Sequence, residues 1–192
     1  MSRVAELMIA VAGVVRGATD DTGRVFDDDA VRAELDRYDL STLLKDSARA
    51  PFARICLLRA KPVRGADGRL AQDVSLAIIV VADREGAADP EFSSADIAAL
   101  RLVDACTLAL MLAPNVGLGR ISDVDIGDGL VAVSEQSNDQ GMAIAMLEAK
   151  WRLHDAYQPS PRKVWATALD PASSQPQTVV INGVEYPVGG QP

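Results

Sequence analysis

The amino-acid sequence predicts an α+β fold: a mainly antiparallel sheet of two hairpins packed against helices, with a C-terminal β-hairpin extension. Apolar and charged residues alternate over positions 147–154, which is typical of a long strand with one buried face. Apolar residues recur at helical spacing over positions 97–111, which indicates a helix. Six prolines follow Tyr157, so we expect an α+β domain at 1–157 and a proline-rich extension at 158–192 with a hairpin at 178–188.

The composition excludes several classes of protein. A formal net charge of −8 argues against a nucleic-acid-binding surface, which needs clustered Lys and Arg. His154 is the only histidine, so mechanisms and metal sites that require two histidines are excluded. Cys56 and Cys106 lie far apart in apolar segments, so we expect buried thiols rather than a disulfide or a zinc pair. No apolar run reaches the roughly 20 residues that span a bilayer, so we expect a soluble protein without membrane contact.

The first 45 residues are expected to form two helices. Apolar residues from Val4 to Val15 lie on one helical face, and Glu6 interrupts them early, which favours a helix over a signal peptide. Asp27 or Asp28 is expected to cap a second helix that runs to about Lys45. Carboxylates in a first helical turn oppose the helix dipole, so the Asp run at 27–29 needs no metal ion.

Two strands in the middle of the chain are expected to pair antiparallel. Residues 52–60 are rich in β-favouring side chains, and Pro62 is expected to end their ladder. Residues 74–82 are apolar apart from Ser75, so this strand is predicted to be central and covered on both faces.

The helix that follows is expected to pack on this sheet. Ser93 or Ser94 is its predicted cap, and Pro114 is predicted to end it. Three residues widen its apolar arc, so a second layer or a neighbouring subunit is expected to cover its back; these are Leu102, Cys106 and Ala109.

A second hairpin is expected from β-like residues at 120–126 and 130–133, interrupted at 128–129, pairing with a strand at 142–153. Alternate residues of the last strand are predicted to face the core, namely Leu147, Ala149, Trp151 and Leu153. The others are predicted to face water or another subunit, namely Glu148, Lys150, Arg152 and His154. In the extension, Asn182-Gly183 favours a two-residue hairpin turn. A lone hairpin is barely stable, so this one is expected to dock on its own domain or on an adjacent subunit.

Candidate chemistry is sparse. Asp123, Asp125 and Asp128 are the best calcium candidates, but they lack the spacing of an EF-hand loop, which favours a solvated strand end. No serine-hydrolase elbow and no dinucleotide or Walker glycine pattern is present. Glu34 and Glu148 are carboxylates that nothing in the sequence brings together. We therefore expect no catalytic, cofactor-binding or metal-binding residues.

Three segments carry a resemblance to a known family: residues 74–82, residues 96–112 and residues 141–151. Their order, with an N-terminal helix before them, resembles the phage tail-terminator fold and is similar to Mu-like prophage proteins of the tail-completion type. The resemblance covers roughly residues 1–155 as an order of elements, and its motifs are apolar patterns rather than invariant groups. The extension beyond Tyr157 departs from the shorter tail terminators.

The resemblance implies a structural virion protein. Such a subunit forms a ring with itself, usually a hexamer, that ends tail-tube polymerisation and forms the head-facing end of the tail. Its expected partners are the tail tube protein and a head-to-tail connector or stopper protein, and the genome DNA passes through without specific binding. The expected location is the virion, with assembly in the host cytoplasm. Candidate interface residues are Glu148, Lys150, Arg152, Trp165, Val180 and Tyr186.

Two alternatives remain open. One is a cytoplasmic adaptor or assembly chaperone for phage morphogenesis that uses the strand at 142–153 and the C-terminal hairpin. The other, less favoured, is a metal-dependent hydrolase built on Asp123, Asp125 and Asp128.

Overall fold

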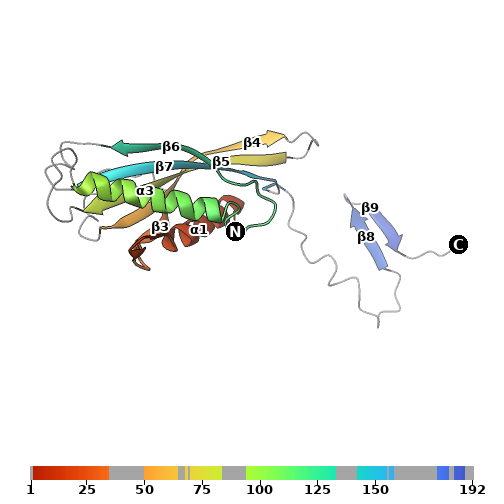
Figure 1. The fold of residues 1–192 in the computed structure, drawn as a ribbon. Coiled ribbons are helices and arrows are strands. Elements are labelled where there is room, and N and C mark those ends of the chain that lie inside the picture. The colour runs from red at the N-terminus through yellow and green to blue at the C-terminus, as the bar shows by residue number, and fades with distance from the viewer. Residues whose placement is uncertain are drawn as a thin grey trace. The chain divides into compact units, whose positions relative to one another are not determined.

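A computed structural model describes residues 2–34, 50–64, 68, 70–83, 94–132, 142–154, 156–157, 177–181 and 184–188. The chain divides into two compact units, Met1–Tyr157 and Gln158–Pro192. The first unit holds a five-stranded mixed sheet in the order β3-β4-β5-β7-β6, with helices α1 and α3 packed on it (Figure 1). The second unit holds the hairpin β8–β9. The predicted α+β fold is confirmed.

The helices and strands have the following bounds: α1 Arg3–Arg16, β1 Thr19–Asp20, β2 Gly23–Arg24, β3 Val31–Glu34, β4 Phe52–Arg64, β5 Leu70–Asp83, α3 Ser94–Leu112, β6 Asp125–Ala132, β7 Met142–Leu153, β8 Gln177–Ile181 and β9 Val184–Val188.

Helix α1 is amphipathic, as its apolar spacing predicts. Its buried residues recur every three or four positions and pack into the main core; they are Leu7, Met8, Val11, Ala12 and Val15. Burial of a Leu or Val side chain stabilises a fold by about 1.5–3 kcal/mol, so this face holds α1 on the sheet.

Strand β5 is central, as its continuous apolar run predicts. It pairs antiparallel with β4 on one side and with β7 on the other. Leu76, Ile78 and Val80 face the helices, whereas Ile79 and Val81 join a second buried cluster. Burial on both faces explains why residues 76–82 are all apolar, whereas Ser75 is only partly buried.

The prediction that Pro62 ends the β4 ladder is wrong. Pairing with β5 continues to Arg64, and Pro62 is opposite Gln72. On its other side β4 pairs with β3 as far as Cys56 among the described residues, so within this part of the chain Pro62 lies where β4 is an edge strand. A proline is tolerated in an edge strand because its nitrogen, which carries no hydrogen, can lie on the side that has no neighbouring strand.

The expected second helix does not begin where it was predicted. Residues 31–34 form β3, which pairs parallel to β4 with Val31 opposite Ala53. The rest of that predicted helix, residues 35–49, lies outside the described residues. The buried Arg54 side chain holds β3, because its Nε lies 3.0 Å from Glu34 Oε1 and its Nη1 donates to the Ala30 carbonyl oxygen at 3.0 Å.

The predicted helix cap at Asp27 or Asp28 is therefore also wrong. The Asp run lies in a turn before β3, closed by a hydrogen bond from the Ala30 N–H to the Asp27 carbonyl oxygen at 3.1 Å. Asp28 Oδ1 forms an ion pair with Arg24 at 2.6 Å. These carboxylates stabilise a turn rather than a helix.

Helix α3 packs on the sheet as expected and ends before Pro114. It begins at Ser94, whereas Ser93 lies outside the described residues. Five buried residues form its core face, namely Ala99, Leu102, Ala105, Cys106 and Leu110. Leu102 and Cys106 thus belong to the core and do not form the back of the helix.

Strands β6 and β7 pair antiparallel as the second predicted hairpin, but the details of β6 differ from the prediction. Ile121 makes only an isolated bridge to Leu153, and β6 begins at Asp125. The predicted break at 128–129 is a β-bulge, because Ile126 is opposite Ala149 and Gly129 is opposite Leu147. Two residues of β6 therefore oppose Glu148 alone, and pairing continues to Ala132.

Trp151 belongs to the core, as its position in the alternating strand predicts. Its side chain is 2% exposed, and its Nε1 donates to the Pro114 carbonyl oxygen at 2.9 Å. The turn that follows Pro114 holds Val116 at a φ of 45°, which a β-branched residue rarely adopts. The indole therefore fastens a strained turn to the sheet.

In the second unit, β8 and β9 pair antiparallel, with Ile181 opposite Val184. The two-residue loop that joins them is Asn182-Gly183, which lies outside the described residues. The hairpin predicted at 178–188 is confirmed as a strand pair, Gln177–Ile181 with Val184–Val188.

Candidate functional site

The face of β7 that points away from the helices carries charged side chains. Leu147, Ala149, Trp151 and Leu153 are buried, whereas Glu148, Lys150 and Arg152 alternate with them and remain partly or fully exposed. We call Asp73, Glu148, Lys150 and Arg152 the charged sheet face, since Asp73 on the adjacent β5 lies directly opposite Arg152. Three of the residues predicted for an interface thus lie together on one surface.

Arg152 and Asp73 form a two-pronged ion pair across the two strands. Arg152 Nε donates to Asp73 Oδ1 at 2.6 Å, and Arg152 Nη2 donates to Asp73 Oδ2 at 3.0 Å. The hydrogen bond from Arg152 lowers the pKa of the Asp73 carboxyl below its ordinary value, and the same bond raises the pKa of Arg152. Both side chains are open to solvent, at 47% and 40% exposure, so the pair adds little stability but fixes the orientation of both groups.

Lys150 lies between carboxylates. Its Nζ is 3.5 Å from Glu148 Oε1 on the same strand, and its backbone is opposite Asp125 on β6. The β6 bulge lies against Glu148, since a Cβ added at Gly127 would lie 3.2 Å from the Glu148 Cβ. The absence of a side chain at Gly127 therefore leaves room for Glu148 at its observed position.

A shallow depression of about 480 Å³ opens beside these residues. It is lined by residues of β5, β7, the start of β6 and the segments that precede β6 and follow β7, namely Asp73, Val74, Ser75, Ser122, Asp123, Asp125, Lys150, Trp151, Arg152 and His154. The Ser122 hydroxyl is held by the backbone, because it donates to the Asp123 carbonyl oxygen at 2.9 Å and accepts from the Arg152 N–H at 2.9 Å. The depression thus offers fixed charges of both signs, which suits contact with a polar protein surface.

The predicted calcium candidates do not gather around one point. Asp123, Asp125 and Asp128 are each exposed, and Asp128 lies in the bulge. Among the described residues, no group of three His, Cys, Asp or Glu side chains is placed to hold a metal ion. The carboxylates Glu34 and Glu148 are also apart, since β4 and β5 separate their strands.

The remaining predicted interface residues belong to the second unit. Trp165 lies outside the described residues. Val180 is on β8 opposite Glu185, and Tyr186 is on β9 opposite Val179.

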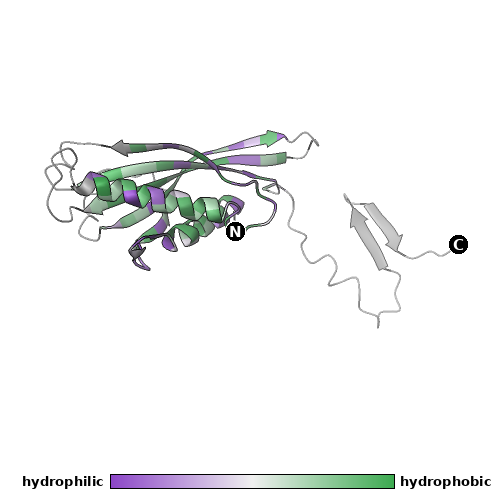
Figure 2. Cartoon of the chain, in the orientation of Figure 1, coloured by the Kyte–Doolittle hydropathy of each residue, from purple (hydrophilic) through white to green (hydrophobic). Residues whose placement is uncertain are grey.

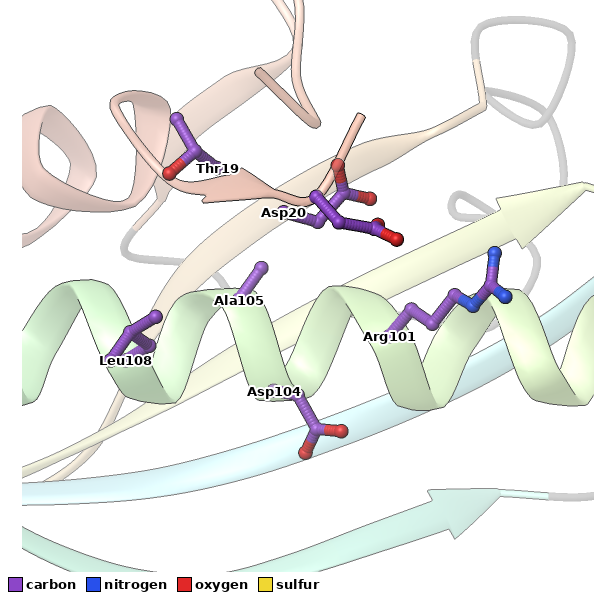
Figure 3. A pocket seen from close by; sticks show the side chains of 7 residues that line it. Thr19, Asp20, Arg101, Asp104, Ala105 and Leu108 are labelled. Carbon is purple, nitrogen blue, oxygen red and sulfur yellow. The ribbon is translucent and has the colours of Figure 1, made fainter. Parts of the chain in front are cut away.

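A second hollow, of about 240 Å³, lies between α3 and the β1–β2 turn (Figure 3). Arg101, Asp104 and Leu108 of α3 line it together with Asp20 and Asp21. Hydrogen bonds from the Thr22 hydroxyl and N–H, together with the Gly23 N–H and the nearby Arg101 charge, lower the pKa of Asp20. Sequence reasoning missed this hollow because the β1–β2 turn and α3 are distant in the chain.

The outward side of α3 is apolar to an unusual degree for a surface helix. Its exposed large side chains are Leu100, Leu108, Met111 and Leu112, of which Met111 is 64% and Leu112 is 77% exposed. The sequence contains this signal, because apolar residues occur all round the helix. The prediction assigned the outward positions to the wrong residues.

No helix in the part of the chain that the structure describes is long and apolar enough to cross a membrane. No protein-family model matches this chain, and no curated protein matches it.

Proposed function

We propose that this chain is a structural virion protein, a subunit of a ring that ends tail-tube polymerisation and forms the head-facing end of a phage tail. Its partners are further copies of itself, the tail tube protein, and a head-to-tail connector or stopper protein. In this role the protein acts by fitting surfaces together and not by a chemical reaction.

The order of elements supports the proposal. A helix, a long hairpin, a second helix and a second hairpin follow one another as α1, β4–β5, α3 and β6–β7. This is the order on which the resemblance to tail terminators rests. A fold alone does not define a function, so the surface that makes the contacts must also fit the role.

The charged sheet face is the observation that carries the proposal. It is rigid, because its residues stand on two strands that pair over twelve positions, from Gln72 with Leu153 to Asp83 with Met142. It combines carboxylates with Lys150 and Arg152, so a neighbour can be aligned by charges of both signs. A ring repeats one contact between two different surfaces until it closes, and this face serves as one of the two.

The position of β7 limits how it can contact a partner. Its two edges are occupied by β5 and β6, so it cannot add a strand from another protein. Contacts through this strand must use its side-chain face. Within the described sheet the edge strands are β3 and β6.

Native mass spectrometry of the purified protein, alone and with tail tubes, tests the proposal. We expect a single mass that corresponds to a closed ring, at least in the sample that contains tail tubes. A protein inventory of purified phage particles should also contain the chain. A chain that is absent from particles and forms no ring in either sample would contradict the proposal and favour an assembly chaperone.

A further inference from the structure

The outward side of α3 carries a stripe with regular spacing. We call Ile97, Leu100, Arg101, Asp104, Leu108 and Met111 the α3 stripe. Ile97 is partly buried, and the other five residues are exposed. In Figure 2 the hydrophobic colour of α3 is interrupted by hydrophilic bands.

The spacing of the stripe is that of a helix that pairs with another helix. Ile97, Arg101, Asp104 and Leu108 follow one another at intervals of four, three and four residues. Alternating steps of three and four keep residues on one side of a helix, where they can contact a second helix. We call these four residues the seam. The seam lies away from the buried core face of α3, although Arg101, Asp104 and Leu108 also line the hollow beside the β1–β2 turn.

We propose that the α3 stripe binds the α3 stripe of a second copy of this chain, antiparallel and related by a two-fold axis that passes between Leu102 and Val103. In this register Ile97 packs against Leu108 of the second copy, and Arg101 faces Asp104 of the second copy. The symmetry repeats each contact, so the dimer contains two apolar layers around two ion pairs.

Charge complementarity supports a second copy as the occupant. The arginine and the aspartate occupy the only two positions of the seam that are not apolar, and this one register pairs each with its opposite. Within the described residues, neither Arg101 nor Asp104 forms an ion pair within 4.0 Å, although the Arg101 charge acts on Asp20 across the hollow. In Figure 3 the two side chains project from α3 in different directions, with Arg101 on the side of Asp20 and Asp104 pointing away from it. The hollow next to them gives the guanidinium of a second copy room to reach Asp104.

This contact goes beyond the proposed ring. A two-fold contact uses the same surface on both copies and cannot close a cyclic ring by itself. It pairs two free subunits, or it pairs two rings face to face. The α3 contact and the ring contact are therefore separable.

Charge reversal on each side of the seam tests the pairing. In the Arg101→Glu variant each copy presents two carboxylates, and in the Asp104→Arg variant each presents two guanidinium groups. We expect the dimer dissociation constant of each variant to rise by about tenfold or more, because like charges then face each other twice. Sedimentation velocity over a concentration series measures it.

Mixing the two variants is the decisive step. Position 101 of one variant then faces position 104 of the other with opposite charge at both sites, so we expect heterodimers in the mixture. The variant with both reversals, Arg101→Glu with Asp104→Arg, should dimerise like the wild type. The controls are Arg32→Glu and Asp29→Arg, which make equal charge changes at exposed positions away from α3 and should leave the dimer unchanged.

Four results would overturn the α3 pairing: a monomeric wild type throughout the series, single variants that dimerise normally, a mixture that stays monomeric, or controls that weaken the dimer equally. If the protein forms a single ring whose mass is the same in the α3 variants as in the wild type, only this inference is contradicted. A charge-dependent dimer without rings supports this inference and contradicts only the ring.

Discussion

Arg152 of β7 and Asp73 of β5 are directly opposite each other, and the guanidinium donates hydrogen bonds to both carboxylate oxygens at 2.6 and 3.0 Å. Residues directly opposite on antiparallel strands have neighbouring Cβ atoms, so an opposite-charge pair here favours the observed register. The pair lies at one end of the charged sheet face, because Glu148, Lys150 and Arg152 follow one another along β7.

The Asp73 carboxyl makes a pH-dependent contribution to stability. Its folded pKa is lowered by the Arg152 hydrogen bond, so its contribution is present above the ordinary value of 3.8 and is lost as the pH falls through the folded pKa. Removing the carboxyl in the Asp73→Asn variant should cost about 1 kcal/mol or less at neutral pH, because the pair is solvent-exposed. Urea denaturation at pH 7 and pH 3 measures the difference, which should shrink at the lower pH. An equal difference at both values would contradict this account of the pair.

Lys150 is expected to matter for assembly and not for folding. The Lys150→Glu variant places a third carboxylate beside Glu148 and Asp125 on a partly exposed surface, so its melting temperature should stay close to that of the wild type. Ring formation should weaken, since one sign of charge then dominates the face. Arg32→Glu, which makes the same charge change on β3, is the control. Normal rings from Lys150→Glu would show that this face is not an interface.

Trp151 should contribute strongly to the free energy of unfolding. The Trp151→Phe variant loses the hydrogen bond to the Pro114 carbonyl oxygen and part of the buried ring, which should cost about 1–3 kcal/mol. Denaturation in guanidinium chloride measures the loss. A change within experimental error would mean that the indole does not fasten the turn that holds Val116.

Cys106 should be inert in the folded protein. Burial raises the pKa of its thiol to about 12, and the side chain has no exposed surface, so almost no thiolate is present at pH 8. Iodoacetamide labelling followed by peptide mass spectrometry should modify Cys106 only after unfolding. Fast labelling of Cys106 in the native protein would contradict its place in the core.

Much of the fold could be predicted because local patterns and tertiary packing agree. The alternation on β7 and the continuous apolar run of β5 each follow directly from which faces are buried. The spacing of α1 also matches its core face. In these elements one segment alone contains the signal.

The errors lie where distant residues decide the structure. The spacing of Val31 and Leu35 resembles a helix, but Val31 is in a strand because β4 pairs with it in parallel. The ladder of β4 with β5 passes Pro62, where no described residue of β3 pairs with β4, which no local rule detects. The break expected at 128–129 is a bulge because β7 provides a continuous partner.

The candidate surfaces were predictable only in part. Alternation placed Glu148, Lys150 and Arg152 on one face, but Asp73, the partner of Arg152, is 79 residues away in the sequence. The outward stripe of α3 needed the structure, because the sequence does not say which apolar side of the helix meets the sheet.

The central claim is that this chain ends the tail tube, and the most direct measurement is the length of tails in phage that lack its gene. Electron microscopy of such particles should show tails of irregular length that are not joined to heads, and supplying the gene in trans should restore both properties. Tails of normal length joined to heads in the absence of the gene would contradict the account.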